Sequence, residues 1–203
     1  MDAFNLLKAD HRKVEELFQQ LESATGKKKL DVFAQIKTEL DLHAHIEEKV
    51  FYPALEKPSE THDLTMEAYE EHEQVKTLLR QLARARTVND EWEAKAKVLQ
   101  ENVEHHVEEE ENELFPKAGD VLEDEEIEAL GMRMEEEKTR KQRGSSKSSK
   151  SSKKAAGKAA NKTAGTKKAA AKAAKRVSRP SGSTTKKSGS KKSGKKRSGA
   201  KKR

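Results

Sequence analysis

Two segments of the sequence place a histidine and a glutamate four residues apart. His43 is followed by Glu47, and His106 is followed by Glu110; in both copies a proline comes six residues after the glutamate. Residues four apart lie on the same face of an α-helix, so each pair points an imidazole nitrogen and a carboxylate oxygen to one place. Such a pair can hold one metal ion, or its carboxylate can bridge two. The repeated spacing therefore predicts a set of metal ligands.

Two further histidines begin a second repeated pattern. After His11 and after His72, apolar residues stand three, six, seven and ten positions later. These two segments are 61 residues apart, whereas the two His-x-x-x-Glu segments are 63 residues apart. The sequence therefore predicts two copies of a helical hairpin. In each copy the first helix contributes one histidine, and the second contributes a histidine and a glutamate.

The elements that must position these residues are long amphipathic helices. Apolar residues recur at intervals of three and four over four long stretches and one shorter one. We expect helices at residues 2–24, 30–55, 62–86, 89–114 and 123–138. Pro53 and Pro116 read as stop signals, and Asp2 and Asn89 as helix caps. Short connections and the absence of strand patterns predict an all-α fold, an up-down-up-down four-helix bundle with the short fifth helix across its end.

Six of the repeated polar residues fall on core positions of these helices. They are His11, His43, Glu47, His72, His106 and Glu110. A single histidine in an apolar stripe is more often a hydrogen-bonded core residue than a ligand. Burying all six without a cation would cost on the order of several kcal/mol per ion, so the set predicts a metal site. The other histidines, His45, His62 and His105, fall off the stripe and are expected on the surface.

The ligand types limit the metal. The chain has no cysteine, which excludes thiolate ligands, cysteine nucleophiles and disulfides. Nitrogen and oxygen ligands without sulfur suit two iron ions best, with manganese or zinc as alternatives.

Charge is strongly segregated along the 203 residues. Residues 1–137 contain all 36 Asp and Glu with 17 Lys and Arg, a net charge of −19, whereas residues 138–203 contain 26 Lys and Arg and no acid. This division predicts a helical domain over residues 1–138 and a basic tail over residues 139–203 that is too poor in apolar residues to fold alone. No apolar run reaches the roughly 20 residues of a membrane span. With no basic-then-apolar leader at the N-terminus, a soluble intracellular protein is expected.

The composition of the tail suits a polyanion. Its lysines and arginines can neutralise phosphates without reading bases, so the expected partner is nucleic acid, bound non-specifically and in a salt-sensitive way. The residues expected to make these contacts are Lys153, Lys154, Lys167, Lys168, Lys175, Arg176, Lys186, Lys187, Lys191, Lys192, Lys195, Lys196 and Arg197. In composition the tail resembles those of linker-histone-like proteins. Two alternatives remain: the tail folds back on the acidic domain, or Lys175–Pro180 is a nuclear import signal.

The helical part resembles a hemerythrin-like domain, also called an HHE cation-binding domain. The resemblance rests on Asp10-His11, Glu71-His72 and the two His-x-x-x-Glu segments with their prolines, and it covers residues 1 to about 137. It implies a four-helix bundle with a non-haem di-iron centre in its core. By its match to that family, the chain would use the four histidines as terminal ligands, each bound to one ion, and Glu47 and Glu110 as carboxylates that bridge the two ions or bind one of them.

Two departures from the oxygen-carrying hemerythrins bear on function. Those proteins have a second histidine four residues along the third helix, where this chain has Lys76, and they use an aspartate in a His-x-x-x-x-Asp motif, where this chain has Glu110. Both departures argue against reversible oxygen carriage. A coordination position left open by the missing histidine would be filled by water, by Tyr69, or by one of the glutamates that follow the core pair, Glu48 and Glu111.

The sequence thus favours a di-iron protein that binds or senses oxygen, peroxide, nitric oxide or iron, held on nucleic acid by its tail. One alternative is a di-iron oxidase or peroxidase. The other is a structural DNA-binding protein whose bundle is stabilised by metal. The expected location is the cytoplasm, next to the nucleoid, or the nucleus in a eukaryote.

Overall fold

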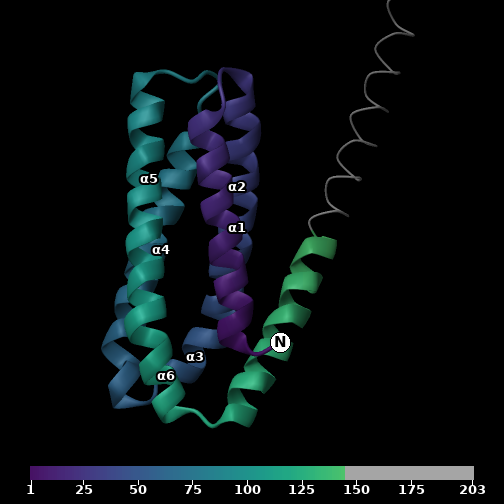
Figure 1. Ribbon diagram of the computed structural model, residues 1–203, viewed down its shortest axis with the longest axis vertical. Helices are drawn as coiled ribbons and strands as arrows, with labels where there is room; N and C mark the ends of the chain where they lie inside the picture. The colour runs from purple at the N-terminus through teal and green to yellow at the C-terminus, as the bar shows by residue number, and fades with distance from the viewer. Residues whose placement is uncertain (145–203) are drawn as a thin grey trace, which may run out of the picture. The chain divides into compact units, whose positions relative to one another are not determined.

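Four long helices lie side by side in the computed structural model, which describes residues 1–144 (Figure 1). They are α1 (Ala3–Ser23), α2 (Lys27–Ile46), α4 (Ser59–Leu82) and α5 (Asp90–Glu109). A further helix occupies residues 124–144 and so runs past the expected end at 138. The described residues contain no strand, and the predicted all-α four-helix bundle with a fifth helix is confirmed. The first residues of the predicted tail, 139–144, thus belong to this helix, and residues 145–203 lie outside the described residues.

Local sequence explains where the helices begin. The side chain of Asp2 accepts a hydrogen bond from the Asn5 backbone N–H at 2.8 Å, which caps α1. Asn89 caps α5 in the same way by accepting from the Trp92 N–H at 2.9 Å. Both predicted caps are therefore confirmed. Between α1 and α2 the chain turns at Gly26, whose φ of 55° is in the left-handed region that favours glycine.

The two prolines, read as stop signals, do not end their helices: the chain stays helical to the expected Leu55 in the first repeat and runs past the expected end at 114 in the second. After α2 the chain forms one π-helical segment, η1 (Glu47–Phe51), and continues into α3 (Tyr52–Leu55). After α5 it forms η2 (Glu110–Leu114) and continues into α6 (Phe115–Val121). Each proline stands in the first turn of the following helix, where its missing N–H breaks no hydrogen bond. The wider π turn also moves the preceding carbonyls away from the proline ring.

The core is divided by the polar side chains of the middle of the bundle. Towards the α1–α2 connection, apolar residues such as Phe18, Phe33, Leu79 and Trp92 form one cluster. Towards the other end, a second cluster contains residues of η1, α3 and α6 together with the start of α1. The four core histidines fall between these clusters along each helix. The apolar layers on both sides keep water away from the histidines.

The helix at residues 124–144 packs against the first residues of the chain (Figure 1). Its predicted apolar residues Ile127, Leu130 and Met134 are buried. At Gly131 the backbone of the N-terminus approaches so closely that an added Cβ would lie 2.4 Å from the Met1 carbonyl oxygen. One turn beyond Met134, Lys138 reaches the carboxylate of Asp10 in α1, with its Nζ 2.6 Å from Oδ2.

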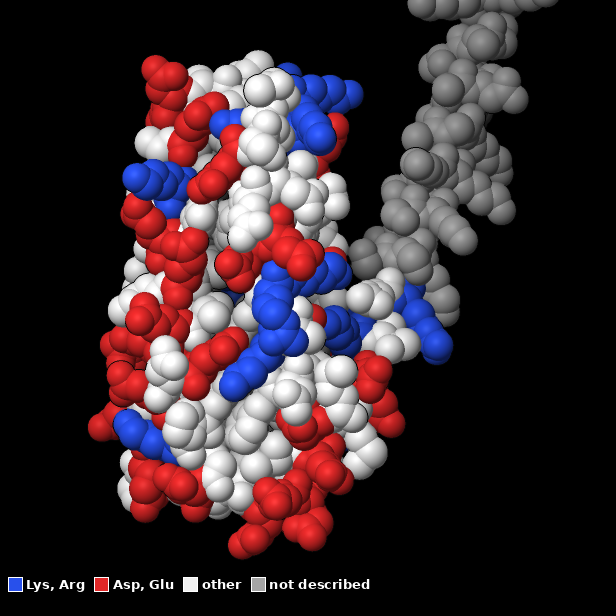
Figure 2. Space-filling view, in the orientation of Figure 1, with Lys and Arg blue, Asp and Glu red and all other residues white. Residues whose placement is uncertain are grey.

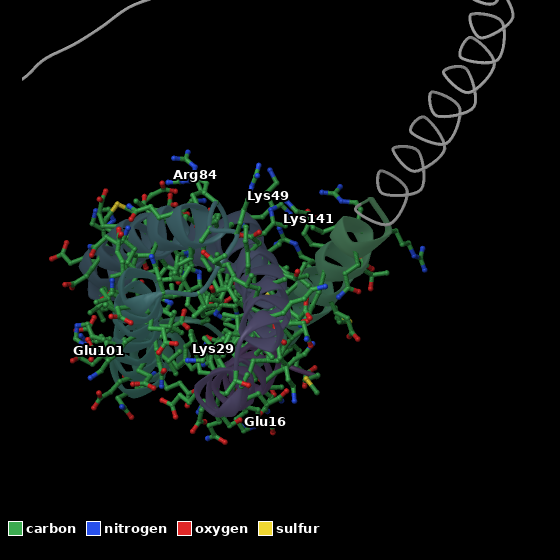
Figure 3. All side chains as sticks on the ribbon, turned by 90° about the horizontal axis from the view of Figure 1, so that it is seen from above. Glu16, Lys29, Lys49, Arg84, Glu101 and Lys141 are labelled. Carbon is green, nitrogen blue, oxygen red and sulfur yellow. The ribbon has the colours of Figure 1, made fainter. Side chains whose placement is uncertain are left out.

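Charged side chains cover the outside of the described bundle. In Figure 2, Asp and Glu predominate along the side where α4 and α5 lie. In the view from above, Glu16, Lys49 and Glu101 point outward on three different sides (Figure 3). None of the helices among residues 1–144 is long and apolar enough to cross a membrane.

Candidate metal centre

The structure brings all six predicted ligand residues together in the middle of the bundle. Each of them is 6% exposed or less. The histidines come one from each long helix, and the glutamates are the first residues of the two π segments. The sequence repeat is thus a repeat in space, with one hairpin supplying His11, His43 and Glu47, and the other supplying the remaining three.

The histidines face one another in two pairs. The Nε2 atoms of His11 and His43 are 3.2 Å apart, and the Nε2 atoms of His72 and His106 are also 3.2 Å apart. The two carboxylates lie among these nitrogens. Glu47 Oε2 is 3.1 Å from His43 Nε2 and 3.4 Å from His72 Nε2, so this one oxygen lies beside both pairs. Glu110 Oε2 is 3.3 Å from His11 Nε2.

The outer nitrogens of the histidines face carboxylates of neighbouring helices. His11 Nδ1 donates to Glu111 at 2.7 Å, and His106 Nδ1 donates to Glu71 at 2.7 Å. A carboxylate at Nδ1 keeps the proton there and leaves the lone pair on Nε2. In the His72–His106 pair both outer nitrogens are hydrogen-bonded to carboxylates, so two Nε2 lone pairs face each other across a short gap. That arrangement is repulsive unless a cation or a proton lies between the nitrogens.

Of the remaining two histidines, only His72 has a carboxylate hydrogen-bonded to its outer nitrogen. His72 Nδ1 donates to Glu48 at 2.9 Å, while Asp10 lies 3.9 Å from His43 Nδ1. Glu48 and Glu111, which the sequence offered as extra ligands, therefore orient the histidines from outside and do not reach the inner face. Tyr69 does not face the centre either, since its hydroxyl donates to Glu56 at 2.8 Å.

Several polar atoms of the centre have no hydrogen-bond partner among the described residues. They are both carboxylate oxygens of Glu47, Glu110 Oε2 and His43 Nδ1. Unpaired buried carboxylate oxygens are costly, and a cation is the partner that would satisfy several at once. The ligand atoms form two groups, and the atoms of each group lie within 4.8 Å of one another. The first group is His11, His43, Glu47 and Glu110, and the second is Glu47, His72 and His106. The donor set therefore fits two ions that share Glu47.

The protonation of the centre favours cation binding. Burial and the negative charge of Glu110 raise the pKa of Glu47 well above its usual value. Burial alone would also raise the pKa of Glu110, but the nearby imidazoles of His11 and His106 lower this pKa to about 2. Burial lowers the pKa of His43 to about 4, so its imidazole is neutral at pH 7. Without an ion Glu47 thus keeps a proton, which a metal would replace.

Tyr52 is a residue of the centre that the sequence reasoning missed. It is fully buried, its hydroxyl donates to Glu110 Oε1 at 3.2 Å, and it lies 3.4 Å from His72 Nε2. At the matching place in the second repeat stands Phe115, whose ring lies parallel to that of His11 with centroids 6.2 Å apart. The two residues therefore differ by one hydroxyl. The signal was present in the sequence. The two repeats end in Phe51-Tyr52-Pro53 and Leu114-Phe115-Pro116, and only the first has a hydroxyl on its middle aromatic residue.

A small cavity lies beside the four histidines. Its volume is about 20 Å³, and apolar side chains such as Val14, Val75 and Leu79 line it together with the imidazoles. Such a volume is enough for about one water molecule. The centre is therefore closed to large substrates and has room only for a small ligand.

Comparison with known proteins agrees with this geometry. The model of the hemerythrin HHE cation binding domain family matches residues 2–118. An uncharacterized protein of Mycobacterium tuberculosis is 32% identical over 141 residues, which cover 66% of this chain and 83% of that protein. A DNA nickase of Nostoc sp. is 32% identical over 129 residues, or 63% of this chain, but the match spans only 36% of the nickase.

A solved structure also resembles this chain. The crystal structure of an HHE cation binding domain-containing protein from Mycobacterium kansasii, a homologue of the M. tuberculosis protein, superposes with a TM-score of 0.60. The two chains are 29% identical, and the match covers 68% of this chain and 88% of the other. Residues 2–118, which the family model matches, include all six residues of the His/Glu cluster, whose arrangement could hold metal ions. The chain therefore belongs to the hemerythrin HHE cation-binding domain family.

Proposed function

We propose that the bundle holds two non-haem iron ions and uses them to bind a small oxygen or nitrogen-oxide ligand. His11 and His43 would hold one ion, His72 and His106 the other, and Glu47 and Glu110 would lie between them. The observation that carries this proposal is the pair of short Nε2–Nε2 distances, 3.2 Å in each half, with carboxylates hydrogen-bonded to the outer nitrogens of His11, His72 and His106. Iron, when bound, supplies reversible redox chemistry and Lewis acidity.

The protein's own residues limit what reaches the ions. The cavity of about 20 Å³ has room for about one water molecule, so it limits access to the smallest ligands, and its apolar lining excludes bulk water. Tyr52 is the one hydroxyl group that makes a hydrogen bond to the cluster of six ligand residues in the part of the chain that the structure describes. It donates its proton to Glu110 and is not among the residues that line the cavity.

The test of this proposal is a metal analysis of protein purified after growth with iron. We expect about two iron ions per chain and near-ultraviolet absorption bands of a bridged ferric pair. Glu47→Ala should lose both ions, because Glu47 Oε2 lies beside both histidine pairs. His62→Ala is a matched control, since His62 is exposed and its Nδ1 bonds only to the Glu56 carbonyl oxygen. Zinc or manganese in place of iron, or no metal, would reject the proposal.

A second candidate function is turnover of peroxide, and Tyr52 is the observation that favours it. A buried hydroxyl donor beside the ligand cluster can supply a proton to a small oxygen ligand, which a passive binder does not require. Rapid peroxide consumption that falls strongly in Tyr52→Phe, at unchanged iron content, would favour an enzyme. Equal rates in the two proteins would favour binding or sensing.

We further propose that the basic tail holds this chemistry on nucleic acid, next to the nucleoid. Support comes from the 26 Lys and Arg with no acid over residues 138–203. Lysine contacts to phosphates release counterions, so the affinity should fall steeply with salt. A chain that ends at residue 144 should lose binding to duplex DNA in gel-shift assays across a salt series. Unchanged binding would remove the tail from this function.

The relative named DNA nickase defines one more outcome for the same experiment. This chain matches only 36% of that protein, so a nicking activity cannot be transferred from it by similarity alone. Supercoiled plasmid included in the binding reactions distinguishes the possibilities. Intact plasmid is expected if the chain only binds. If the plasmid becomes relaxed with the unchanged protein but not with Glu47→Ala, which lacks the metal, the chain cleaves DNA strands in a metal-dependent way. That result would replace the proposed tethering function. DNA binding that persists in metal-free protein would support a structural role.

A further inference from the structure

A second His-x-x-x-Glu pair lies one residue before the inner pair of the second repeat. His105 and Glu109 stand four apart on α5, as His106 and Glu110 do, but they face outward. His105 Nε2 is 3.3 Å from Glu109 Oε1. Glu71 from α4 approaches from the side, and one ligand atom from each of these three residues lies within 4.8 Å of the others.

The third member of this outer cluster is connected to the inner centre. Glu71 Oε2 accepts the hydrogen bond from His106 Nδ1 at 2.7 Å, and the Glu71 side chain is 17% exposed. Glu109 is 30% exposed and His105 is 63% exposed. One carboxylate therefore has a histidine ligand of the buried centre on one side and a solvent-accessible imidazole and carboxylate on the other.

The first repeat shows what this position requires. Asp10 occupies the place of Glu71, and Lys138 supplies a fixed cation to it, with Nζ 2.6 Å from Oδ2. The places of His105 and Glu109 are taken by Leu42 and Ile46, which are buried. In the first half the charge of Asp10 is thus neutralised by the fixed Lys138 ammonium, and the buried side chains of Leu42 and Ile46 stand where the second half has an exposed imidazole and a carboxylate.

The second half has no such fixed cation in the described part of the chain. The only ion pair that Glu71 makes there is with His106. The surface next to it is a hollow of about 320 Å³, lined by carboxylates, amides and one imidazole. Its lining residues are Glu67, Glu70, Glu71, Gln74, Asn102 and His105. A concave surface of one charge sign concentrates ions of the opposite sign.

We propose that Glu71, His105 and Glu109 form a second, outer site for one divalent transition-metal ion. One imidazole nitrogen and two carboxylate oxygens suit zinc, iron(II) or manganese(II), and water would complete the coordination. In this half of the molecule an exchangeable ion takes the place that the Lys138 ammonium has in the other half. Since Glu71 also holds His106, an ion at the outer site alters the hydrogen bond to a ligand of the inner centre.

The experiment uses the full chain as purified with its inner ions. Zinc is titrated by equilibrium dialysis and calorimetry, and we expect one further ion per chain. His105→Ala and Glu109→Gln should each weaken this binding by roughly tenfold or more. Both side chains are at least partly exposed, so neither substitution should affect folding. His62→Ala, which removes an exposed histidine elsewhere, should bind zinc as the unchanged protein does.

A second readout tests the connection through Glu71. Zinc should shift the absorption of the inner centre in the unchanged protein and leave it unshifted in His105→Ala. No further zinc ion, or zinc affinity unchanged in His105→Ala and Glu109→Gln, would overturn the outer site. Zinc binding without a spectral shift would overturn the connection. The inner metal is counted separately, so the outer site can stand even if the inner ions prove not to be iron.

Discussion

A single hydroxyl distinguishes Tyr52 from Phe115, its counterpart in the second repeat, and the contribution of that hydroxyl to stability can be measured. Tyr52→Phe copies the residue that the second repeat has at this place, so the ring should pack as before. It leaves Glu110 Oε1 without its donor in a fully buried position. We expect the free energy of unfolding of the ion-free protein to fall by about 1–3 kcal/mol in urea titrations.

The matched control for this substitution is Tyr69→Phe. The Tyr69 hydroxyl donates to Glu56, which is only half-buried, so water can replace the lost hydrogen bond. The control should therefore change stability by less than Tyr52→Phe. Equal losses in the two variants would show that the Tyr52 hydroxyl has no special role in the buried cluster.

The raised pKa of Glu47 makes metal binding dependent on pH. Burial and the charge of Glu110 raise this pKa, so ion-free Glu47 is protonated under conditions where an ordinary glutamate is ionised. Metal must displace that proton, and the apparent affinity should therefore rise with pH until the pKa of Glu47 is passed. Calorimetry in buffers of different ionisation enthalpy should detect protons released when metal binds. Glu47→Gln, which carries no such proton, should show no release from this position.

For single residues, the sequence predicted which side chains form the centre better than it predicted which way the neighbouring side chains face. The six inner residues could be found because their spacing is repeated. The outer carboxylates could not be assigned, because Glu48 differs from Glu47 by one position, and only the helix rotation at η1 decides which of them faces inward. Tyr52 was missed for the same reason, since the π turn changes which residues after Glu47 face the centre. His105 was expected on the surface, and it is exposed there.

Among the elements, the helix at residues 124–144 depends on one close backbone contact. In Gly131→Ala the new Cβ would lie 2.4 Å from the Met1 carbonyl oxygen and 2.6 Å from the Asp2 carbonyl carbon. The N-terminal backbone must move away, which should cost roughly 1–3 kcal/mol, a typical penalty of overpacking. The loss should appear as a lower urea midpoint.

Gly144→Ala is the control, because an added Cβ there meets nothing within 4 Å. It should leave the midpoint unchanged or raise it slightly, since alanine favours helix more than glycine does. If Gly131→Ala unfolds at the same urea concentration as Gly144→Ala, the N-terminus is not held against this helix in solution.

The helices themselves were predictable, whereas their irregular turns were not. A stripe of apolar residues at intervals of three and four fixes a long amphipathic helix, and the side chains of Asp2 and Asn89 mark two of the starts. The expected range 30–55 already ran through Pro53, but the continuation through Pro116 to Val121 was not predicted, because proline is a general stop signal. A π turn before a proline removes that conflict, and no residue of η1 announces it, since Glu, Lys, Val and Phe all occur in ordinary α-helices.

For the whole molecule, the unpaired buried atoms predict that metal stabilises the fold. Both oxygens of Glu47 and one of Glu110 lack hydrogen-bond partners among the described residues, so the ion-free bundle bears a desolvation penalty. Ions that bind only the folded state add a stability of about 4 kcal/mol at a free concentration 1,000 times the dissociation constant. Treatment with a chelator should lower the thermal midpoint, and iron should restore it. A midpoint that does not respond to the chelator would contradict this account of the core.

The two π segments also show how closely the two hairpins agree. A π turn contains one residue more than an α turn, and both segments begin on the core glutamate of their repeat. The extra residue stands at the same point in both hairpins, so both keep the same spacing of ten residues from the core histidine to the proline. The two hairpins therefore share one backbone pattern at the centre and differ in side chains such as Tyr52 and His105.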